Sequence, residues 1–286
     1  MIGDVTIYAN YLPYAGYSAT DEPSVVNETY ESSGGETTGP AYDVADNKRT
    51  TLLTIDTNAQ TTNPIIDFDL TTNMVDVDFA IIDNHNFNTA GVKVGIAESL
   101  ASIDMTAYEA SGPGVTTAAS TVTASQVITP VDGISLILLS TATTGNDWKV
   151  GIEENGANYT ANVTIGEIIL GKKFAFSYAP DTPEEISTFD GVTNTVSRGG
   201  QKSSFKSYGV RKAWKLSWPI LLEADKTSLQ TIYEDITEGS HRPFYIDLGE
   251  ESTPKLYYVR FMDNSLRIRK LTAQAYEVSF MIESEI

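Results

Sequence analysis

The stretch Ile66-Asp67-Phe68-Asp69-Leu70, followed by Val75-Asp76-Val77-Asp78-Phe79, alternates apolar and acidic residues along the chain. Apolar residues at every second position put one face of an extended strand on a core and leave the other in water, which is typical of antiparallel sheets. Thr71-Thr72-Asn73 between the two runs predicts a turn. The two runs are therefore expected to be neighbouring strands.

Similar short runs, separated by Gly, Pro, Asn and Asp, continue beyond this stretch up to residue 172. They predict strands over residues 91–97, 120–128, 134–140, 148–153 and 159–170. Many short strands separated in this way predict a β-sandwich or jelly roll for residues 1–172. Within this domain, the Ser-, Gly- and Thr-rich segment 27–40 is expected to be an exposed loop.

Residues 173–286 combine the same alternation with one helical pattern. Four apolar residues spaced three and four apart predict one face of a helix near 225–236, with Asp225 as N-cap and Gly239 after its end. These four are Leu229, Ile232, Tyr233 and Ile236. Alternating runs on both sides of the helix predict strands. In the last of them Tyr276, Val278, Phe280 and Ile282 are expected to face inward, and Pro219 is expected at an edge or exit of its strand. This domain is therefore expected to be a β-sandwich with one flanking α-helix. The fold class is thus mainly β.

The charges are distributed unevenly along the chain, whose formal net charge is −19. Residues 1–170 hold 4 Lys/Arg and 22 Asp/Glu, whereas residues 171–286 hold 15 Lys/Arg and 16 Asp/Glu. A nucleic-acid-binding face needs a basic patch, so nucleic-acid binding is not expected. Two such different segments are expected to be two modules that face different surroundings. The alternative is that the acidic half is only a solubilising surface.

The sequence contains no cysteine, which excludes disulfides, thiolate metal sites and a cysteine nucleophile. No apolar run approaches the roughly 20 residues that a membrane-spanning helix needs, so membrane insertion is not expected. The first residues carry Asp4 and no basic cluster ahead of an apolar segment, and a secretory signal is not expected either.

Candidate catalytic residues are few, because the chain has only two histidines, His85 and His241. Each has an aspartate within six residues, Asp83 and Asp247, but neither lies near a G-x-S-x-G nucleophile motif. We expect both histidines to be structural, His85 at a strand end and His241 in a loop before a strand. A glycosidase would need two carboxylates about 5–10 Å apart, and 38 acidic residues leave no basis for choosing a pair.

A calcium site is the metal site that the sequence favours, because calcium needs only oxygen ligands. Asp43 and Asp46, with Asn47, cluster in a segment ahead of the first strands and are the candidate ligands. The other acidic group, Asp67, Asp69, Asp76 and Asp78, is expected to be the solvent-facing side of the sheet. No further cofactor is expected. Arg198-Gly199-Gly200-Gln201-Lys202 has glycines and cations but lacks the spacing of a phosphate loop, and it is expected to be a turn between strands.

Aromatic residues offer a possible contact surface at the N-terminus, where four tyrosines recur every third residue. They are Tyr8, Tyr11, Tyr14 and Tyr17. Exposed aromatics in loops favour contact with protein or carbohydrate. The alternative is that this segment packs over its own domain.

The first domain resembles the discoidin-like (F5/8-type) galactose-binding jelly rolls. The residues that carry the resemblance are Asp43–Thr50, Pro64–Leu70 and Ile81–Phe87. Thr71 replaces the glycine usual in that family, and the usual tryptophan after the loop is missing. The resemblance implies binding of sugars, lipids or proteins through loops at one end, and a calcium site that would fall near Asp43 and Asp46.

The second domain is similar to tail-tube-like and distal-tail-like domains of long-tailed bacteriophages. The matching residues are Gly209–Trp218, the helix Asp225–Ile236, Arg242–Asp247, Tyr258–Phe261 and Glu277–Phe280. The resemblance implies a β-sandwich with a flanking helix that builds rings.

Together these observations predict a structural virion protein of a bacteriophage tail, a ring-forming tail or tail-tip component without enzymatic activity. It would be made in the host cytoplasm and located in the virion. Its expected partners are other copies of itself in a ring, neighbouring tail proteins and a host surface glycan. The alternative is a carbohydrate-binding module or adhesin, for which an exposed Trp or Tyr platform is the feature to seek; Trp148 is the only tryptophan of the first half. A third interpretation is a polysaccharide depolymerase.

Overall fold

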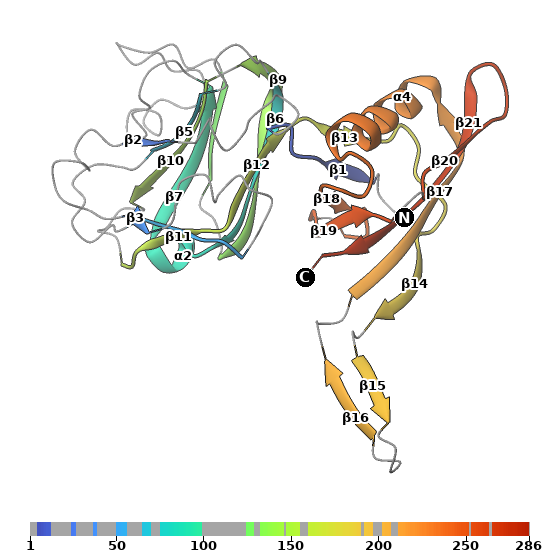
Figure 1. Ribbon diagram of the computed structural model, residues 1–286. Coiled ribbons are helices and arrows are strands. Elements are labelled where there is room, and N and C mark those ends of the chain that lie inside the picture. Colours follow the sequence, from blue (N-terminus) through green and yellow to red (C-terminus); the bar gives the residue numbers. More distant parts are fainter. Residues whose placement is uncertain are drawn as a thin grey trace. The chain divides into compact units, whose positions relative to one another are not determined.

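The computed structural model describes residues 5–12, 24–26, 37–38, 50–55, 65–69, 75–98, 124–128, 132–145, 147–154, 160–189, 192–196, 202–206, 211–251, 253–262 and 265–285. The chain forms two compact units (Figure 1). We call Asn10–Lys172 the sandwich unit, and Met1–Ala9 with Lys173–Ile286 the helix-bearing unit. The fold is mainly β, as predicted. None of the helices in the described part of the chain is long and apolar enough to cross a membrane.

The sandwich unit contains two main antiparallel sheets. One has the strand order β2 (Ser24–Val26), β5 (Ile65–Asp69), β10 (Asp147–Glu154), β7 (Val92–Glu98) and β8 (Ala124–Ile128). The other has the order β12 (Glu167–Gly171), β6 (Val75–His85) and β9 (Gly133–Gly145). A small third sheet joins β11 (Val163–Ile165), β4 (Leu53–Ile55) and β3 (Thr37–Thr38), and α2 (Phe87–Ala90) follows β6.

One apolar core is shared by these sheets, which makes the unit a β-sandwich as predicted. Its members come from every sheet, and all are buried. They include Phe68 on β5, Ile96 on β7, Val150 on β10, Ile82 on β6, Ile137 on β9, Leu170 on β12 and Leu53 on β4. The inward positions are mostly Ile, Val and Leu, whose branched side chains fill the space between two sheets.

The prediction that the runs Ile66–Leu70 and Val75–Phe79 form neighbouring strands is wrong. β5 pairs with β2 and β10, whereas β6 pairs with β9 and β12, so the chain passes from one sheet to the other between them. Contrary to the prediction, Asp78 does not lie on a solvent-facing side of the sheet, since it is only 9% exposed. The register between β6 and β9 shifts at this position, between Val77 and Phe79. A bulge of this kind turns the side chains of the strand away from strict alternation.

The helix-bearing unit is built on one eight-stranded sheet (Figure 1). Its order is β13 (Lys173–Ala175), β1 (Thr6–Tyr8), β18 (Phe244–Asp247), β19 (Leu256–Phe261), β21 (Ala275–Ser284), β17 (Arg211–Leu222) and β14 (Glu184–Phe189). β20 (Arg267–Lys270) also pairs with β21. Residues 1–9 were predicted to belong with the first domain, but β1 pairs with β13 and β18 and therefore belongs to this sheet.

The core of the helix-bearing unit is a run of aromatic rings in contact, two pairs stacked, one T-shaped and one tilted. Trp218 lies 4.0 Å from Phe176 and 5.5 Å from Phe280 between ring centroids. Phe280 contacts Phe261 at 5.3 Å, and Phe261 contacts Phe244 at 4.7 Å. The four inward residues predicted for the last strand, Tyr276, Val278, Phe280 and Ile282, are all buried.

The predicted helix is present, but it begins two residues before the predicted N-cap. α4 spans Glu223–Thr231 and continues as a π-helical turn over Ile232–Ile236. Asp225 is therefore not the N-cap of α4, a position held by Leu222. Its carboxylate instead accepts hydrogen bonds from the backbone N–H and the hydroxyl of Ser177 at 3.1 and 3.0 Å. Gly239, with φ of 70°, donates its N–H to the carbonyl of Tyr233 and ends the helical segment as predicted.

Pro219 lies within β17 and not at its exit. The register between β17 and β21 shifts between Trp218 and Leu221, so Pro219 falls in a bulge where its missing N–H breaks no regular ladder bond.

Candidate functional site

His85 is the histidine closest to possible catalytic partners, and its hydrogen bonds give it a structural role. The Phe87 backbone N–H donates to His85 Nδ1 at 3.3 Å, so Nδ1 is the acceptor nitrogen. Nε2 then carries the proton and lies 2.9 Å from the hydroxyl oxygen of Ser135. A catalytic serine must instead give its proton to the imidazole, with a carboxylate on the other nitrogen. The arrangement is that of a neutral histidine that joins β6 to β9.

Burial keeps this imidazole neutral. His85 is 4% exposed and its ring stacks on Phe87 with 4.1 Å between centroids. The loss of hydration lowers the pKa of His85 to about 4, although the charges of Asp132 and Asp83 act in the opposite direction. His241 lies in an exposed turn ahead of β18, as expected.

A set of polar side chains fixes the loop around α2 at one end of the sandwich unit. Asp132 accepts hydrogen bonds from both the backbone N–H of Thr89, at 3.0 Å, and its hydroxyl. The Thr160 hydroxyl donates to the Thr89 carbonyl at 2.6 Å, and the Asn86 amide donates to the Asn162 carbonyl at 2.8 Å. We call these five residues the loop cluster. The bonds from Thr89 lower the pKa of Asp132, which keeps this exposed carboxylate ionised.

The aromatic platform that a glycan site would need is not formed by Trp148. Trp148 is fully buried on β10, and its indole N–H donates to the carbonyl of Gly145 at 3.3 Å. Tyr8 is buried in the helix-bearing unit, and Tyr11 packs against the core of the sandwich unit. Tyr14 and Tyr17 lie outside the described residues.

The candidate calcium ligands Asp43 and Asp46 lie outside the described residues, as does Asn47. Within the described part of the chain, no three His, Asp or Glu residues gather to hold a metal ion. Of the acidic residues expected on the wet face, Asp76 pairs with Lys172 at 3.1 Å. Its pKa is lowered by the Thr144 hydroxyl first and by Lys172 second.

The most distinctive feature of the helix-bearing unit is a hairpin that stands apart from the main sheet. β15 (Val192–Val196) pairs with β16 (Lys202–Lys206), and within the described residues neither strand pairs with any other. The hairpin follows directly on the β14–β17 pair, whose last register partners are Phe189 and Arg211 (Figure 1). We call β15 and β16 the hairpin arm.

The sequence predicted only a turn between the two strands of the hairpin arm, and not the strands themselves. Arg198-Gly199-Gly200-Gln201-Lys202 is not a phosphate loop by its spacing and was expected to be a turn between strands. Residues 197–201 lie outside the described residues, but the strands on both sides pair with each other. The missed signal is the alternation in Val192-Thr193-Asn194-Thr195-Val196, which is weak because only its two end residues are apolar.

No family model matches the chain, and no curated protein matches it either. Similar solved structures include the family 32 carbohydrate-binding module of Clostridium perfringens NanJ in complex with galactose. That alignment has 12% identity and a TM-score of 0.32, and it covers 49% of this chain and 92% of that one. CpGH89CBM32-6 produced by Clostridium perfringens aligns with 17% identity and a TM-score of 0.30, covering 48% of this chain and 91% of that one.

A fucolectin from striped bass (Morone saxatilis) serum aligns over 88% of this chain and 96% of its own, with 12% identity and a TM-score of 0.29. Likenesses at this level assign neither a family nor a function, and the functional conclusion below depends on the geometry.

Proposed function

We propose that the protein is a non-catalytic structural subunit that assembles with copies of itself, and that it serves as a ring-forming component of a bacteriophage tail or tail tip. The hairpin arm is the observation that carries this proposal. The sandwich unit would face outward as the part that contacts the host surface, and the assembled protein would be located in the virion.

The hairpin arm needs a partner for physical reasons. A two-stranded hairpin alone is marginally stable in water, and its outer edges present unpaired N–H and C=O groups. A strand or surface of a neighbouring subunit would complete these edges by strand addition. The main sheet also ends in two edge strands, β13 and β14, that have one partner each among the described strands. Repeated copies joined in this way form a closed ring when the rotation closes.

The tail assignment is supported by the residues that resemble tail-tube-like and distal-tail-like domains. Those residues lie in β17, α4 with its π-helical turn, β18, β19 and β21. They include the inward side chains of the aromatic core, such as Trp218 and Phe280. The histidine geometry described above supports a subunit without hydrolytic chemistry.

Negative-stain imaging and sedimentation velocity of the full chain test the proposal. We expect rings or symmetric oligomers. In a matched variant, an Asn-Gly turn would replace residues 191–209 and close the hairpin directly beyond the β14–β17 pair. We expect this variant to keep its circular-dichroism spectrum and to sediment as a monomer. A wild-type chain that remains monomeric at every concentration would contradict the proposal.

A second candidate function is carbohydrate binding by the sandwich unit, and the loop cluster favours it. Sugar-binding sites need polar groups held in fixed positions by a rigid scaffold. Thr89, Asp132 and Thr160 are exposed at one end of the sandwich and are held by mutual hydrogen bonds. This function is compatible with the first, because the same virion protein can assemble and attach to a host glycan.

Binding to a glycan array before and after Asp132→Asn tests the second candidate. Asp76→Asn is the matched control, because Asp76 is also a carboxylate of the sandwich unit that accepts a threonine hydroxyl bond. Loss of glycan binding in Asp132→Asn alone supports a site at the loop cluster. Equal binding by all three proteins, or none by the wild type, argues against it.

A further inference from the structure

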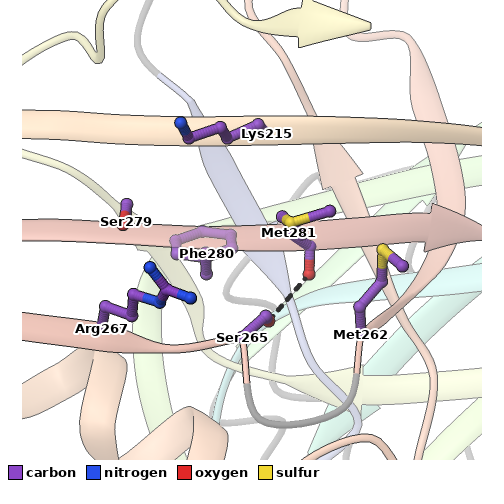
Figure 2. Close-up of a pocket in the computed structure, with 7 residues that line it drawn as sticks. All are labelled: Lys215, Met262, Ser265, Arg267, Ser279, Phe280 and Met281. Atoms are coloured by element: carbon purple, nitrogen blue, oxygen red, sulfur yellow. Dashed lines mark hydrogen bonds between the residues drawn. The ribbon is translucent and has the colours of Figure 1, made fainter. Parts of the chain in front are cut away.

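A pocket lies on the sheet of the helix-bearing unit where β17, β21 and β20 run side by side (Figure 2). Its volume is about 420 Å³. The lining includes two cations, Lys215 and Arg267, two hydroxyls, Ser265 and Ser279, and two thioethers, Met262 and Met281. Arg267 is the register partner of Ser279, and Lys215 is the register partner of Met281, so the two cations flank the same segment of β21.

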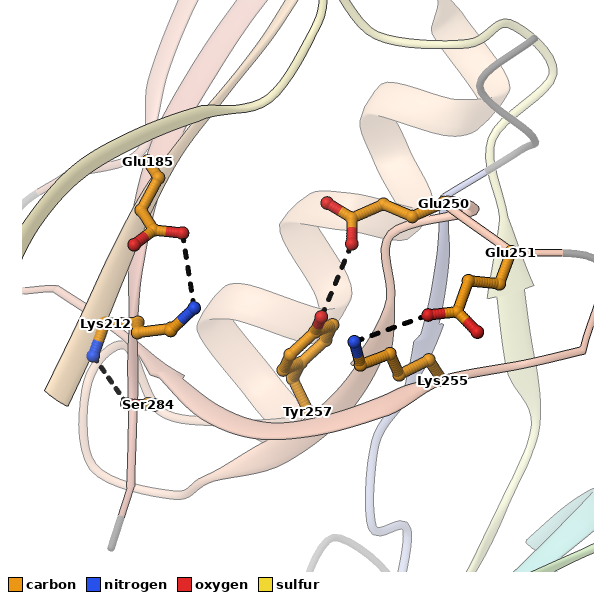
Figure 3. A network of polar contacts seen from close by, with 7 residues as sticks. All are labelled: Glu185, Lys212, Glu250, Glu251, Lys255, Tyr257 and Ser284. Carbon is orange, nitrogen blue, oxygen red and sulfur yellow. Dashed lines mark hydrogen bonds and ion pairs between the residues drawn. The ribbon is translucent and has the colours of Figure 1, made fainter. Parts of the chain in front are cut away.

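No ion pair joins Lys215 or Arg267 to a carboxylate within the described residues, although Glu184 of β14 is the register partner of Lys215. Arg269, two residues along β20, pairs with Glu277 at 3.3 Å. Lys212 pairs with Glu185 at 3.4 Å (Figure 3), and Arg211 lies 4.0 Å from Glu283. The Lys215 ammonium and the Arg267 guanidinium can therefore both bind a further anion, and of the two only Lys215 has a carboxylate as a register partner.

The lining is suited to an oxyanion carried on a short hydrocarbon chain. Two cations attract a carboxylate, and Arg267 offers a guanidinium that binds carboxylates with two parallel hydrogen bonds. Ser279 supplies a hydroxyl beside them. The methionine side chains Met262 and Met281 offer adaptable apolar contact to the methylene groups of an acidic side chain.

We propose that this pocket receives acidic side chains from the sandwich unit of a second copy of the chain. This inference rests on the proposed self-assembly and names one contact that stabilises it. The pocket is open in the single chain, and the partner it fits is an acidic protein surface.

Charge complementarity supports this choice of partner. Residues 10–172 hold 21 Asp/Glu and only 5 Lys/Arg. Residues 191–222, which include the hairpin arm and Lys215, hold 6 Lys/Arg and no Asp/Glu. An acidic unit and a cationic strand region on every copy attract each other between copies, and opposite potentials of this kind set both association rate and partner choice.

Sedimentation velocity of the double variant Lys215→Glu with Arg267→Glu, in the full chain, tests the contact. The matched control is Lys226→Glu with Lys255→Glu, which changes the net charge by the same amount on other elements of the same unit. We expect the pocket variant to weaken association by about tenfold or more, and the control to associate like the wild type. Citrate, used as a small tricarboxylate probe, should weaken wild-type association and leave the residual association of the pocket variant unchanged.

The outcomes separate this inference from the proposed function. Wild-type assembly that is equally strong in the pocket variant overturns the pocket contact and leaves self-assembly standing. A wild type that never associates overturns both. Citrate binding at Lys215 and Arg267 in a chain that does not associate would assign the pocket to a small anion and overturn the second copy as its partner.

Discussion

The sandwich unit and the helix-bearing unit are both built from alternating strands, but they differ in how their sheets are covered and in what fills their cores. The sandwich unit closes two sheets over one core of mostly Ile, Val and Leu. The helix-bearing unit covers one sheet with a helix, packs aromatic rings against one another in its core and extends a hairpin whose edges are unpaired among the described residues. The proposed self-assembly assigns the contacts between copies to the edges of the hairpin arm, although the sandwich sheets also end in edge strands, such as β2 and β8.

Charge follows the same division. Most of the net negative charge of the protein lies in residues 10–172, whereas the helix-bearing unit is close to neutral and has a cationic stretch around its hairpin. Under the proposed self-assembly, like subunits would attract through unlike regions, and such head-to-tail contacts form a ring when the rotation closes.

The largest expected effect comes from removing the central aromatic side chain of each core. Trp218 and Trp148 are both fully buried, so Trp218→Ala and Trp148→Ala should each lower the free energy of unfolding by about 4 kcal/mol. Each loss should appear only in the transition of its own unit. Chemical denaturation followed by far-UV circular dichroism would measure both losses, because Trp148→Ala removes the only tryptophan of the sandwich unit and with it the fluorescence signal of that unit.

An exposed aromatic provides the control, because Tyr178 is 52% exposed. Tyr178→Ala should change the unfolding free energy by only a few tenths of a kcal/mol. If either tryptophan substitution shifted both transitions equally, the two units would unfold as one, and the comparison between them would lose its basis.

A pH effect of about 3 kcal/mol is expected in the sandwich unit alone. Burial lowers the pKa of His85 from 6.5 to about 4, so between these values the unfolded chain binds a proton that the folded chain does not. The contribution is fully present above pH 6.5 and is lost as the pH falls through about 4, which amounts to roughly 3 kcal/mol. Urea denaturation at a series of pH values would measure it.

His85→Gln removes the titrating group and is the matched comparison. The two curves should run parallel above about pH 6.5, and the wild type should lose roughly 3 kcal/mol relative to the variant as the pH falls from 6.5 to 4. A wild-type sandwich unit with the same dependence on pH as the variant would show that His85 does not carry the effect.

A smaller loss of unfolding free energy is expected where α4 is hydrogen-bonded to Ser177, just after β13. Asp225 is 7% exposed and binds both polar groups of Ser177, so Asp225→Ala should cost the helix-bearing unit about 2 kcal/mol. Asp181→Ala, an exposed carboxylate of the same unit, should cost a few tenths of a kcal/mol. Thermal unfolding of the three proteins measures the difference, and equal midpoints would remove the role assigned to Asp225.

The smallest expected effect concerns the end of the helical segment. Gly239 has φ of 70°, a conformation that costs a residue with a side chain about 1 kcal/mol. Gly239→Ala should therefore destabilise the helix-bearing unit by about 1 kcal/mol, and Gly239→Asn by less, because asparagine tolerates this conformation better. Equal stability of the alanine variant and the wild type would contradict the strain.

Local patterns were enough to predict the mainly β fold, the helix and the inward face of the last strand. Tyr276, Val278, Phe280 and Ile282 alternate clearly because one face of β21 is buried. Pairing partners were not predictable, since they depend on contacts between distant segments. β1 joins β13, more than 160 residues later, and β5 and β6 separate into different sheets although few residues lie between them.

The candidate site was less predictable than the fold. The buried Asp78 follows from a bulge that alternation alone does not reveal, and the strand Val192–Val196 has only two apolar residues to indicate it. The pocket joins Lys215 to Arg267 across two strand pairings, a proximity that no spacing in the sequence indicates. The charge asymmetry was visible in the sequence. The structure adds that cations of β17 and β20 line one pocket.

Backbone hydrogen exchange of the hairpin arm at high and low protein concentration tests self-assembly most directly. The outer-edge amides of Val192–Val196 and Lys202–Lys206 should exchange slowly in the assembled protein and rapidly after dilution to monomers. Amides of β19 and β21, inside the main sheet, should stay protected in both. Exchange in the arm that is equally fast at both concentrations, or equally slow, would contradict assembly through its edges.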